Sequence, residues 1–495
     1  MKLHINGDIN EYYVQTICMI FFPGEKFSGE EEEGAPVLHL DVAEGVDEIT
    51  ATVKLQYQGK ETVATKQIVL SGEFTKDRAR KIVIGHAILS AAGEMMHYRP
   101  SWGMLTGVRP SKVATELLLS GLSKTKARKA LTSHYMVIPK KAALATDVAI
   151  REQQIIGNPD PKDCSVYISI PFCPTRCSYC SFVSYTSKRL LSLIPDYLTL
   201  LCREIRTKFR TIRELGLRVL TVYIGGGTPT ILNAEQLRTL LATVSECTDV
   251  SALLEYTLES GRPDTIDAEK MAIAKAYGVT RVCVNPQTLC DDVLKGVGRC
   301  HSAKDFYRAY NIARQSGIKC INTDLIVGLP GDNFQSFAES YDKILALDPE
   351  NITVHTFCVK KAAEILREGK RVYNLRGGDA GKCVDYSQIR AAEQGYHPYY
   401  MYRQKNMVGN FENVGFAKPG TECLYNIYMM EEVHSIFAAG AGAVTKLVDY
   451  APAGSGKKSV IRRLFNDKYP YEYLESDGGD GQAEQIVQFY RELGF

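Results

Sequence analysis

Three cysteines are the residues of this chain whose spacing points most directly to chemistry. Cys173, Cys177 and Cys180 stand in the pattern C-x3-C-x2-C, directly after a short apolar run at residues 166–170. Thiolates hold iron-sulfur clusters, and three of them leave one iron of a 4Fe-4S cube without a protein ligand. An open iron can bind a substrate. The spacing therefore predicts a cluster with one vacant coordination position.

A zinc knuckle is the alternative interpretation of the three cysteines. Structural zinc sites are closed by four ligands, and no second Cys-x2-Cys or His-x3-His pair appears in the sequence. Three thiols buried by chance are less favoured still. Pro171, Pro174 and the polar pair at residues 175–176 indicate an exposed loop instead.

The segment from Tyr167 to Cys180 resembles the radical S-adenosylmethionine enzymes. More narrowly, it is similar to the oxygen-independent coproporphyrinogen III dehydrogenase family. The resemblance covers residues 160 to 360 well and the last third more loosely. The further segments that carry it are Gly225–Thr230, Glu259, Gln287, Gly298–His301, Asp324–Gly331, Cys423–Asn426 and Gly440–Ala443.

This resemblance implies two cofactors, a 4Fe-4S cluster on the three cysteines and S-adenosylmethionine on the fourth iron. It also implies an α/β fold with a partial (β/α)6 barrel. The residues that it places on S-adenosylmethionine are Tyr167, Tyr179, Gly226, Gly227, Thr228, Glu259, Gln287, Arg299 and Asp324.

Simple chemistry supports several of these roles. The methionine ammonium needs a carboxylate, which Glu259 can supply, and the glycines beside Gly226 allow close approach of the backbone. Gln287 and Asp324 have groups suited to ribose hydroxyls or to a second cofactor, while Arg299 can clamp a carboxylate through two hydrogen bonds. For Gln287, Asp324 and Arg299 the alternative is a structural partner inside the barrel mouth.

In the dehydrogenases of this family, an adenosyl radical removes hydrogen from a porphyrinogen propionate, and loss of carbon dioxide and one electron leaves a vinyl group. Four propionates make such a substrate strongly anionic, so arginine or lysine side chains should bind it. The candidates are Arg262, Arg299, Arg403 and Lys405. Arg262 is the best placed, because it follows a predicted strand end. For Arg403 and Lys405, in a tyrosine-rich stretch, an ordinary edge strand explains the pattern equally well.

Departures from the family pattern leave the reaction open. The best-studied dehydrogenases have histidine at the position of Ser169 and a fourth cysteine where this chain has Ser181 and Phe182. The haem chaperones of the family also lack that cysteine, but their His-Asn-x-x-Tyr-Trp segment differs from the sequence at 424–429. The residues around Trp102 and Arg403 resemble the HemZ-like branch instead.

Three functions therefore remain open. They are decarboxylation of coproporphyrinogen III, haem carriage without turnover, and a radical methyltransferase that opens haem. Either enzyme would need an electron donor such as flavodoxin or ferredoxin. Under the carrier interpretation, His355 and His434 are candidate axial ligands, although each is equally typical of a core or surface histidine.

Composition limits the partners and the compartment. With 59 basic and 57 acidic residues, the net charge of +2 gives no excess for binding nucleic acid. No apolar stretch approaches the ~20 residues of a membrane span, and residues 1–8 lack the apolar core of a signal peptide. The remaining cysteines are scattered singly, as reduced core thiols are. A reducing, oxygen-poor cytoplasm is expected.

The elements that position these residues are predicted in three domains. Residues 1–160 form an α+β accessory domain, 161–360 the barrel, and 361–495 an α/β extension that covers the substrate. Alternation predicts a hairpin at 49–57 and 62–70, and helices are expected at 77–96, 110–120, 140–156, 195–209, 334–347 and 483–493. Barrel strands are predicted to begin near residues 165, 220, 254, 280, 319 and 351. Each chemical motif then falls at the carboxyl end of a strand, which is the catalytic face of such barrels.

Other segments are predicted to be structural. Trp102 is expected to be a buried anchor in its own domain, with a docking surface as the alternative. Residues 451–459 faintly resemble a phosphate loop but are better explained as a hairpin turn. Residues 29–34 are expected to be a surface loop, and 476–481 a flexible linker.

Overall fold

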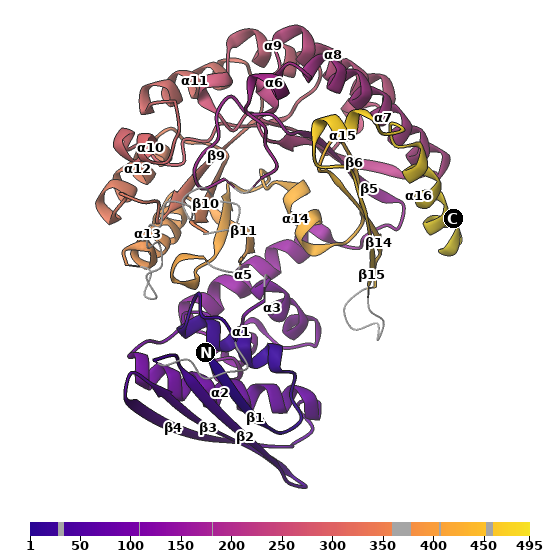
Figure 1. Cartoon of the computed structure of the whole chain (residues 1–495). Helices are drawn as coiled ribbons and strands as arrows, with labels where there is room; N and C mark the ends of the chain where they lie inside the picture. Colours follow the sequence, from indigo (N-terminus) through magenta and orange to yellow (C-terminus); the bar gives the residue numbers. More distant parts are fainter. Residues whose placement is uncertain (28–33, 108, 181, 359–377, 405–406, 452–458) are drawn as a thin grey trace. The chain divides into compact units, whose positions relative to one another are not determined.

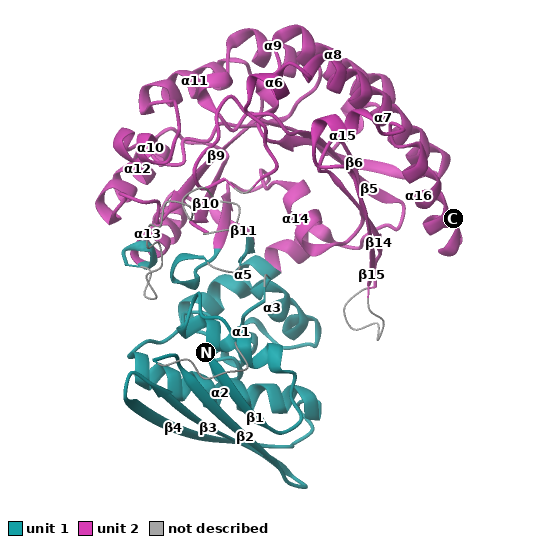
Figure 2. Ribbon diagram, in the orientation of Figure 1, with its two compact units in different colours: residues 1–149, 371–381, 401–412 teal, residues 150–370, 382–400, 413–495 magenta. Residues whose placement is uncertain are grey.

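The computed structural model describes residues 1–27, 34–107, 109–180, 182–358, 378–404, 407–451 and 459–495. The chain divides into two compact units (Figure 2). Unit 1 comprises residues 1–149, 371–381 and 401–412, and unit 2 comprises the rest. The division interrupts the predicted third domain, because residues 401–412 belong with the N-terminal unit. The three-domain division itself stays a prediction.

Unit 1 is a four-stranded sheet with helices packed against it, in the order β1-β2-β3-β4. Its strands are β1 (Lys2–Asn6), β2 (Val37–Glu44), β3 (Glu48–Tyr57) and β4 (Lys60–Val69). Its helices are α1 (Glu11–Phe21), α2 (Lys76–Met96), α3 (Pro110–Leu119), α4 (Lys124–His134) and most of α5 (Pro139–Ile156). The predicted hairpin is confirmed, because β3 and β4 pair antiparallel and the alternate apolar residues of β3 are buried. The helices predicted at 77–96, 110–120 and 140–156 are also confirmed.

The single tryptophan is a buried anchor of unit 1, as predicted. Trp102 is fully buried, and its indole Nε1 donates to Oε2 of Glu412 at 2.8 Å. Lys141 donates to the other carboxylate oxygen at 2.6 Å. This buried pair ties residues 401–412 to the N-terminal helices, a link that local sequence patterns do not reveal.

Unit 2 is built on an eleven-stranded sheet in the order β11-β12-β10-β9-β8-β7-β6-β5-β13-β14-β15. Strands β5 to β10 pair in parallel and in chain order. Their bounds are Asp163–Ile170, Arg218–Gly226, Glu255–Glu259, Arg281–Cys283, Cys320–Val327 and Asn351–Thr356. These starts match the predicted ones, and the α/β fold with a partial parallel barrel is confirmed. β11 (His397–Tyr402) is the edge strand that the tyrosine-rich pattern allowed.

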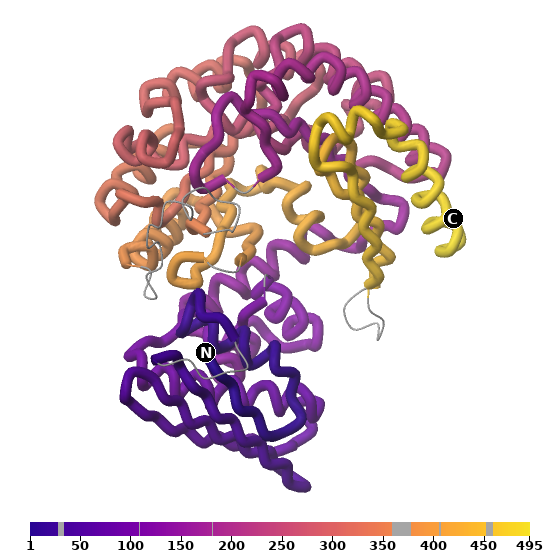
Figure 3. The backbone as a smooth tube through the Cα atoms, in the orientation of Figure 1, coloured from indigo at the N-terminus to yellow at the C-terminus, as the bar shows by residue number. Residues whose placement is uncertain are grey.

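Helices connect the parallel strands and cover the outside of the sheet (Figures 1 and 3). They are α6 (Lys188–Leu191), α7 (Ile194–Glu214), α8 (Ala234–Cys247), α9 (Ala268–Ala276), α10 (Asp291–Gly296), α11 (Ala303–Gln315) and α12 (Phe334–Ala346). The remaining elements are α13 (Ala380–Glu393), β12 (Asn413–Ala417), α14 (Leu424–Glu431), β13 (Ser435–Ala439), β14 (Val444–Asp449), β15 (Val460–Phe465), α15 (Pro470–Leu474) and α16 (Asp480–Glu492). Strands β14 and β15 are paired antiparallel, so the phosphate-loop-like segment connects a hairpin, although residues 452–458 lie outside the described residues. Residues 29–33 of the predicted acidic surface loop at 29–34 lie outside them too. No helix among the described residues is long and apolar enough to cross a membrane.

The inner face of the parallel strands is polar. Alternate strand residues point to opposite faces, and the residues that share the inner face are Ser165, Tyr167, Ser169, Thr221, Tyr223, Thr257, Glu259, Cys283, Asn322, Asp324, Thr353 and His355. Several of them bond to one another, for example Ser165 to Thr221 at 2.7 Å. Ordinary barrels of this type fill the interior with branched apolar residues. A polar interior instead indicates a lumen made for a polar ligand.

The amino-terminal end of the barrel is closed by a buried ion pair. Glu255 and Arg281 lie 3.4 Å apart and are both nearly fully buried. The Glu255 carboxylate also accepts the backbone N–H of Leu424 at 2.8 Å, at the start of α14. A carboxylate at a helix N-terminus is favoured by the helix dipole, so this pair fastens the C-terminal region to the barrel floor.

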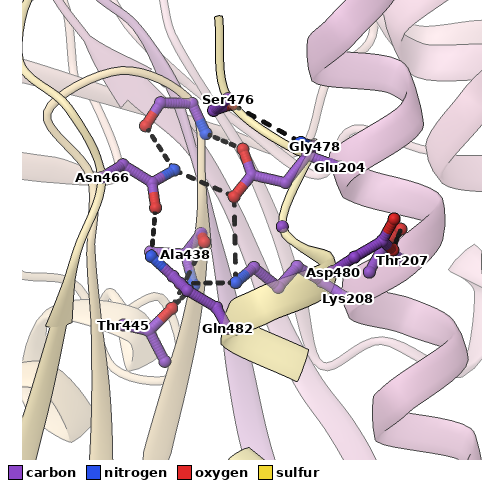
Figure 4. Close-up of polar contacts among 12 residues, drawn as sticks. Glu204, Thr207, Lys208, Ala438, Thr445, Asn466, Ser476, Gly478, Asp480 and Gln482 are labelled. Carbon is purple, nitrogen blue, oxygen red and sulfur yellow. Dashed lines mark hydrogen bonds and ion pairs between the residues drawn. The ribbon is translucent and has the colours of Figure 1, made fainter. Parts of the chain in front are cut away.

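A second buried network joins the C-terminal elements to α7 (Figure 4). The Glu204 carboxylate accepts from Asn466 at 2.9 Å, from the backbone N–H of Gly440 at 2.8 Å and from Tyr473 at 2.7 Å. Lys208 lies 3.8 Å away, and burial lowers the pKa of its ammonium. Residues 476–481 are therefore not a flexible linker: Asp477 accepts two backbone N–H groups at 2.8 Å. The turn is fixed against α7.

Replacing Glu204 with alanine is expected to destabilise unit 2 by about 3–5 kcal/mol, because Lys208 would be left buried without its counter-charge. Urea unfolding under anaerobic conditions measures the change. Glu214→Ala, at the exposed end of the same helix, is the matched control and should shift the free energy of unfolding by less than about 0.5 kcal/mol. Equal effects of the two substitutions would contradict the stabilising role of the network.

Candidate active site

The cysteine loop begins at the carboxyl end of β5 and is held by backbone hydrogen bonds. The N–H of Cys173 donates to the carbonyl of Tyr185 at 3.0 Å, and the N–H of Tyr185 donates to the carbonyl of Pro171 at 2.9 Å. Farther along, the N–H of Cys180 donates to the carbonyl of Cys177 at 3.0 Å. These bonds fold the three-cysteine segment back over the strand end.

All three thiols are at least half-buried and lie near one another. Burial raises the pKa of Cys173 and of Cys180. The nearby Cys177 raises the pKa of both thiols further. Thr228 lies 3.3 Å from the Cys173 sulfur through its hydroxyl oxygen. Because thiols must lose their protons to bind metal, cluster assembly at this loop should release protons.

The glycine turn after β6 packs directly against the cysteine loop. Gly226 has φ +108°, and a Cβ at Gly227 would lie 2.6 Å from the carbonyl oxygen of Phe172 and 2.9 Å from the sulfur of Cys173. No side chain fits there. The glycine turn therefore allows the cysteine loop to approach its backbone closely. Contact of the same glycines with S-adenosylmethionine stays a prediction.

Glu259 lies at the end of β7, inside the barrel mouth. Its carboxylate accepts from Tyr223 at 2.6 Å and from the amide of Asn285 at 3.0 Å. Burial, and then the negative charge of Asp324, raises the pKa of Glu259 to about 7. An added cation would offset both effects, so this carboxylate is suited to an ammonium ligand.

Asp324 lies on β9, and Gln287 lies in the segment after β8, where its backbone N–H donates to the carbonyl of Asp324 at 2.9 Å. Asp324 accepts from Asn322 at 2.7 Å and lies 3.4 Å from the ring of His355. Gln287 has φ +68°, a strained conformation typical of functional positions. Its buried Oε1 has no hydrogen-bond partner among the described residues. A buried acceptor without a donor is costly, and a ligand hydroxyl would satisfy it.

Three tyrosine rings stack inside the barrel near Glu259. The centroid of Tyr167 lies 6.2 Å from that of Tyr223 and 6.1 Å from that of Tyr425, while the last two are 4.7 Å apart. Tyr223 and Asn285 were not predicted as site residues. Tyr223 could have been found from strand pairing, because it lies opposite Tyr167 of the neighbouring strand β5. Asn285 follows β8 and lies two positions before Gln287.

Arg299 connects the cysteine loop to the strand ends. Its guanidinium donates to the hydroxyl of Tyr179 at 3.0 Å and to the carbonyls of Gly261 and Asn285, both at 2.9 Å. Its Nε donates to His301 at 3.3 Å. The three guanidinium nitrogens thus have protein partners. This geometry favours the structural alternative for Arg299 over a carboxylate clamp, which stays a prediction.

Arg262 also bonds to the cysteine loop. Its Nη1 donates to the side chain of Thr175 at 2.8 Å and lies 3.9 Å from the sulfur of Cys177. Its other nitrogens donate to Asp264 at 3.1 Å. Each guanidinium nitrogen thus has a protein partner, and the propionate clamp stays a prediction. Arg262 is better described as a residue that positions the loop.

Arg262→Met is expected to loosen the cysteine loop, because Asp264 and Thr175 would lose a charged partner at a cost of about 1–3 kcal/mol. Iron release to a chelator under anaerobic conditions should accelerate about tenfold, in proportion to that free energy. Arg238→Met, on the exposed face of α8, is the control and should release iron at the wild-type rate. Indistinguishable rates for the two variants would refute the positioning role.

Two other predicted residues, Arg403 and His434, are held by protein partners of their own. Arg403 lies in unit 1, where its guanidinium donates to the carbonyl of Leu105 at 2.5 Å and to Asn410. Lys405 lies outside the described residues. His434 is buried against Ser165 at 2.8 Å, and burial lowers its pKa to about 3, as expected for an ordinary core histidine.

The residues present fit a 4Fe-4S cluster with S-adenosylmethionine. Three thiols occupy one loop, a glycine turn leaves no side chain beside them, and a carboxylate and an unpaired buried acceptor face the lumen. Among the described residues, no three His, Cys, Asp or Glu side chains are arranged to hold a single metal ion. A cube places each thiolate on a different iron, so a cluster does not need such convergence.

Comparisons with known proteins agree with this site. The sequence pattern of the Radical SAM superfamily matches residues 167–344. The oxygen-independent coproporphyrinogen-III oxidase-like protein HemZ of Bacillus subtilis is 35% identical over 472 residues, covering 93% of this chain and 92% of that protein. The chain therefore belongs to the radical S-adenosylmethionine superfamily and, within it, to the family of HemZ. The family resemblance and the two cofactors, a 4Fe-4S cluster and S-adenosylmethionine, are thereby confirmed.

Other relatives are named for a different activity. The haem chaperone HemW of Bacillus subtilis is 33% identical over 65% of this chain and 81% of that protein, and HemW of Escherichia coli is 27% identical over 66% and 81%. Among solved structures, the coproporphyrinogen III oxidase HemN of Escherichia coli matches with a TM-score of 0.50 and 21% identity, over 68% of this chain and 73% of that one. The likeness to HemN supports the fold.

Proposed function

We propose that this chain decarboxylates propionate side chains of coproporphyrinogen III oxidatively and without oxygen, giving the vinyl groups of protoporphyrinogen IX. The observation that carries the proposal is the alignment with HemZ, an oxidase-like protein, over 93% of the chain. The HemW chaperones align with about two thirds of it. The accessory residues of unit 1 thus belong to the resemblance with HemZ.

When bound, the cluster and S-adenosylmethionine supply a 5'-deoxyadenosyl radical that removes one hydrogen atom from the β-carbon of a propionate. The propionate then loses carbon dioxide, and one electron passes to an external acceptor. The hard chemistry belongs to the cofactors, and the protein supplies position and exclusion of water.

Each role proposed for the protein rests on the geometry of the mouth. Glu259 holds the methionine ammonium, because it is a buried carboxylate of raised pKa. Gln287 and Asp324 receive the ribose hydroxyls, since the unpaired Oε1 of Gln287 needs a donor. Arg262 and Arg299 hold the cysteine loop and the strand ends in position through hydrogen bonds.

Anaerobic incubation of the cluster-loaded protein with S-adenosylmethionine, a reductant and coproporphyrinogen III tests the proposal. Protoporphyrinogen and 5'-deoxyadenosine in a fixed ratio are the expected products. A haem carrier is the second candidate, because HemW proteins share the core. Stoichiometric haem binding with no decarboxylated product would favour that carrier and overturn the enzyme, while methylated, ring-opened haem would favour a methyltransferase.

A further inference from the structure

Exposed aromatic side chains lie beside the cysteine loop in unit 2. Tyr469 and Tyr471 are 47% and 52% exposed and stack with ring centroids 5.6 Å apart. The ring of Tyr185 lies 5.9 Å from that of Tyr469. Phe182, two residues after Cys180, is 68% exposed. We call Tyr185, Tyr469 and Tyr471 the aromatic patch.

This patch is physically continuous with the cysteine loop. The carbonyl of Tyr185 accepts the backbone N–H of Cys173 at 3.0 Å. The hydroxyl of Tyr185 donates to the carbonyl of Lys468 at 3.0 Å, which joins the patch to the start of α15. A protein bound on these rings would therefore contact the segment that carries the cysteines.

The loop side of the patch is basic. Residues 171–192 contain Arg176, Lys188 and Arg189 and no acidic residue, and all three are exposed. Among the described residues, none of the three lies within 4.0 Å of a carboxylate. On the other side, Asp467 and Glu472 accompany Lys468. The excess of positive charge thus lies on the cysteine loop.

We propose that this surface binds an acidic, flavodoxin-type electron donor. Small electron-transfer interfaces are polar and transient, and opposite charges raise the rate of encounter. Exposed rings with basic groups on their cysteine-loop side suit the apolar edge of a flavin that has acidic groups beside it. One electron leaves the flavin hydroquinone, which becomes the semiquinone, and the cluster gains that electron. This inference rests on one part of the proposed function, which is that the cluster must be reduced by an external donor.

Charge reversal on the cysteine-loop side tests the proposal. We expect Lys188→Glu/Arg189→Glu to slow anaerobic reduction of the cluster by reduced flavodoxin at least about tenfold at low salt, with the difference shrinking at high salt. Reduction by dithionite and the electron paramagnetic resonance spectrum of the reduced cluster should not change. Arg238→Glu/Lys304→Glu, which changes exposed residues of α8 and α11 by the same charge, should react like the wild type.

Equal rates for the two double variants would overturn the proposal, as would reduction by a ferredoxin but not by the flavodoxin. If reduction by dithionite also slows in Lys188→Glu/Arg189→Glu, the charge reversal has damaged the cysteine loop. The double variant Tyr469→Ser/Tyr471→Ser then tests docking of the flavodoxin instead. That variant changes only the patch, so it should slow flavodoxin and spare dithionite, and unchanged flavodoxin rates would refute docking here. No tetrapyrrole is present in these assays, so their failure is distinct from a failure of the decarboxylation.

Discussion

Alanine at position 177 is expected to abolish the cluster while leaving the fold intact. Reconstituted Cys177→Ala should lack the visible absorbance of a 4Fe-4S cluster and hold little iron, because two thiolates cannot replace the three-ligand set. Cys177 is buried at the centre of the loop, beside Arg262. Loss of the cluster removes the anchor for S-adenosylmethionine, so the proposed decarboxylation should fall to background. Iron and sulfide analysis with electron paramagnetic resonance measures the result.

Cys300 provides a close control for this substitution. It is exposed, and its sulfur lies 3.7 Å from the hydroxyl of Thr175 on the same loop. Cys300→Ala should therefore keep full iron content, because the sulfur is near the loop without being one of its three spaced cysteines. A cluster that survives in Cys177→Ala, or that disappears in Cys300→Ala, would contradict the ligand assignment.

The barrel could be predicted from sequence because its signals are local. Alternating apolar residues, glycine turns and helical periodicity recur in each strand-helix unit, and parallel strands in chain order then bring Glu259, Gln287 and Asp324 to one edge. Carboxylates and amides at that edge could be predicted without any long-range information. The inner-face partner Tyr223 follows the same strand period of two, whereas Asn285 lies in the segment after β8.

The remaining features depend on contacts between distant segments. Arg262 looked like a propionate ligand because it is a cation at a strand end, yet it bonds to Thr175, 87 positions earlier in the chain. Likewise, the turn at residues 476–481 looked like a linker from its glycines, and its order comes from packing against α7. The composition of a segment indicates how flexible its backbone is when isolated. It does not reveal the distant residues that fix the segment in the folded protein.

The affinity for S-adenosylmethionine should depend on the protonation of Glu259. With a pKa of about 7 in the folded protein, its carboxyl group is mostly neutral at pH 6 and mostly charged at pH 8. In the role that we propose for Glu259, only the charged form pairs with the methionine ammonium. We therefore expect the dissociation constant to fall about tenfold from pH 6 to pH 8, as linkage requires for one such group.

The same pKa shift fixes the sign of the stability change. Because the folded pKa lies above the value of 4.5 in the unfolded chain, folding favours the protonated form. Stability of the ligand-free protein should thus fall as pH rises between these two values and stay lower above pH 7. S-adenosylmethionine should offset that loss, so it should raise the melting temperature more at pH 8 than at pH 6.

Glu259→Gln separates this carboxylate from its neighbours. Glutamine has the size and shape of glutamate, and its oxygen can still accept the hydrogen bond from Asn285. It has no charge to titrate, so the affinity of the variant for S-adenosylmethionine should be low and independent of pH. Asp324 and His355 face the same space and remain in the variant, so any slope that they cause would survive. Calorimetric titration with Glu269→Gln, on the exposed face of α9, as the control measures both profiles. A persistent slope in Glu259→Gln would assign the pH dependence to the neighbours and reject Glu259 as the ammonium ligand.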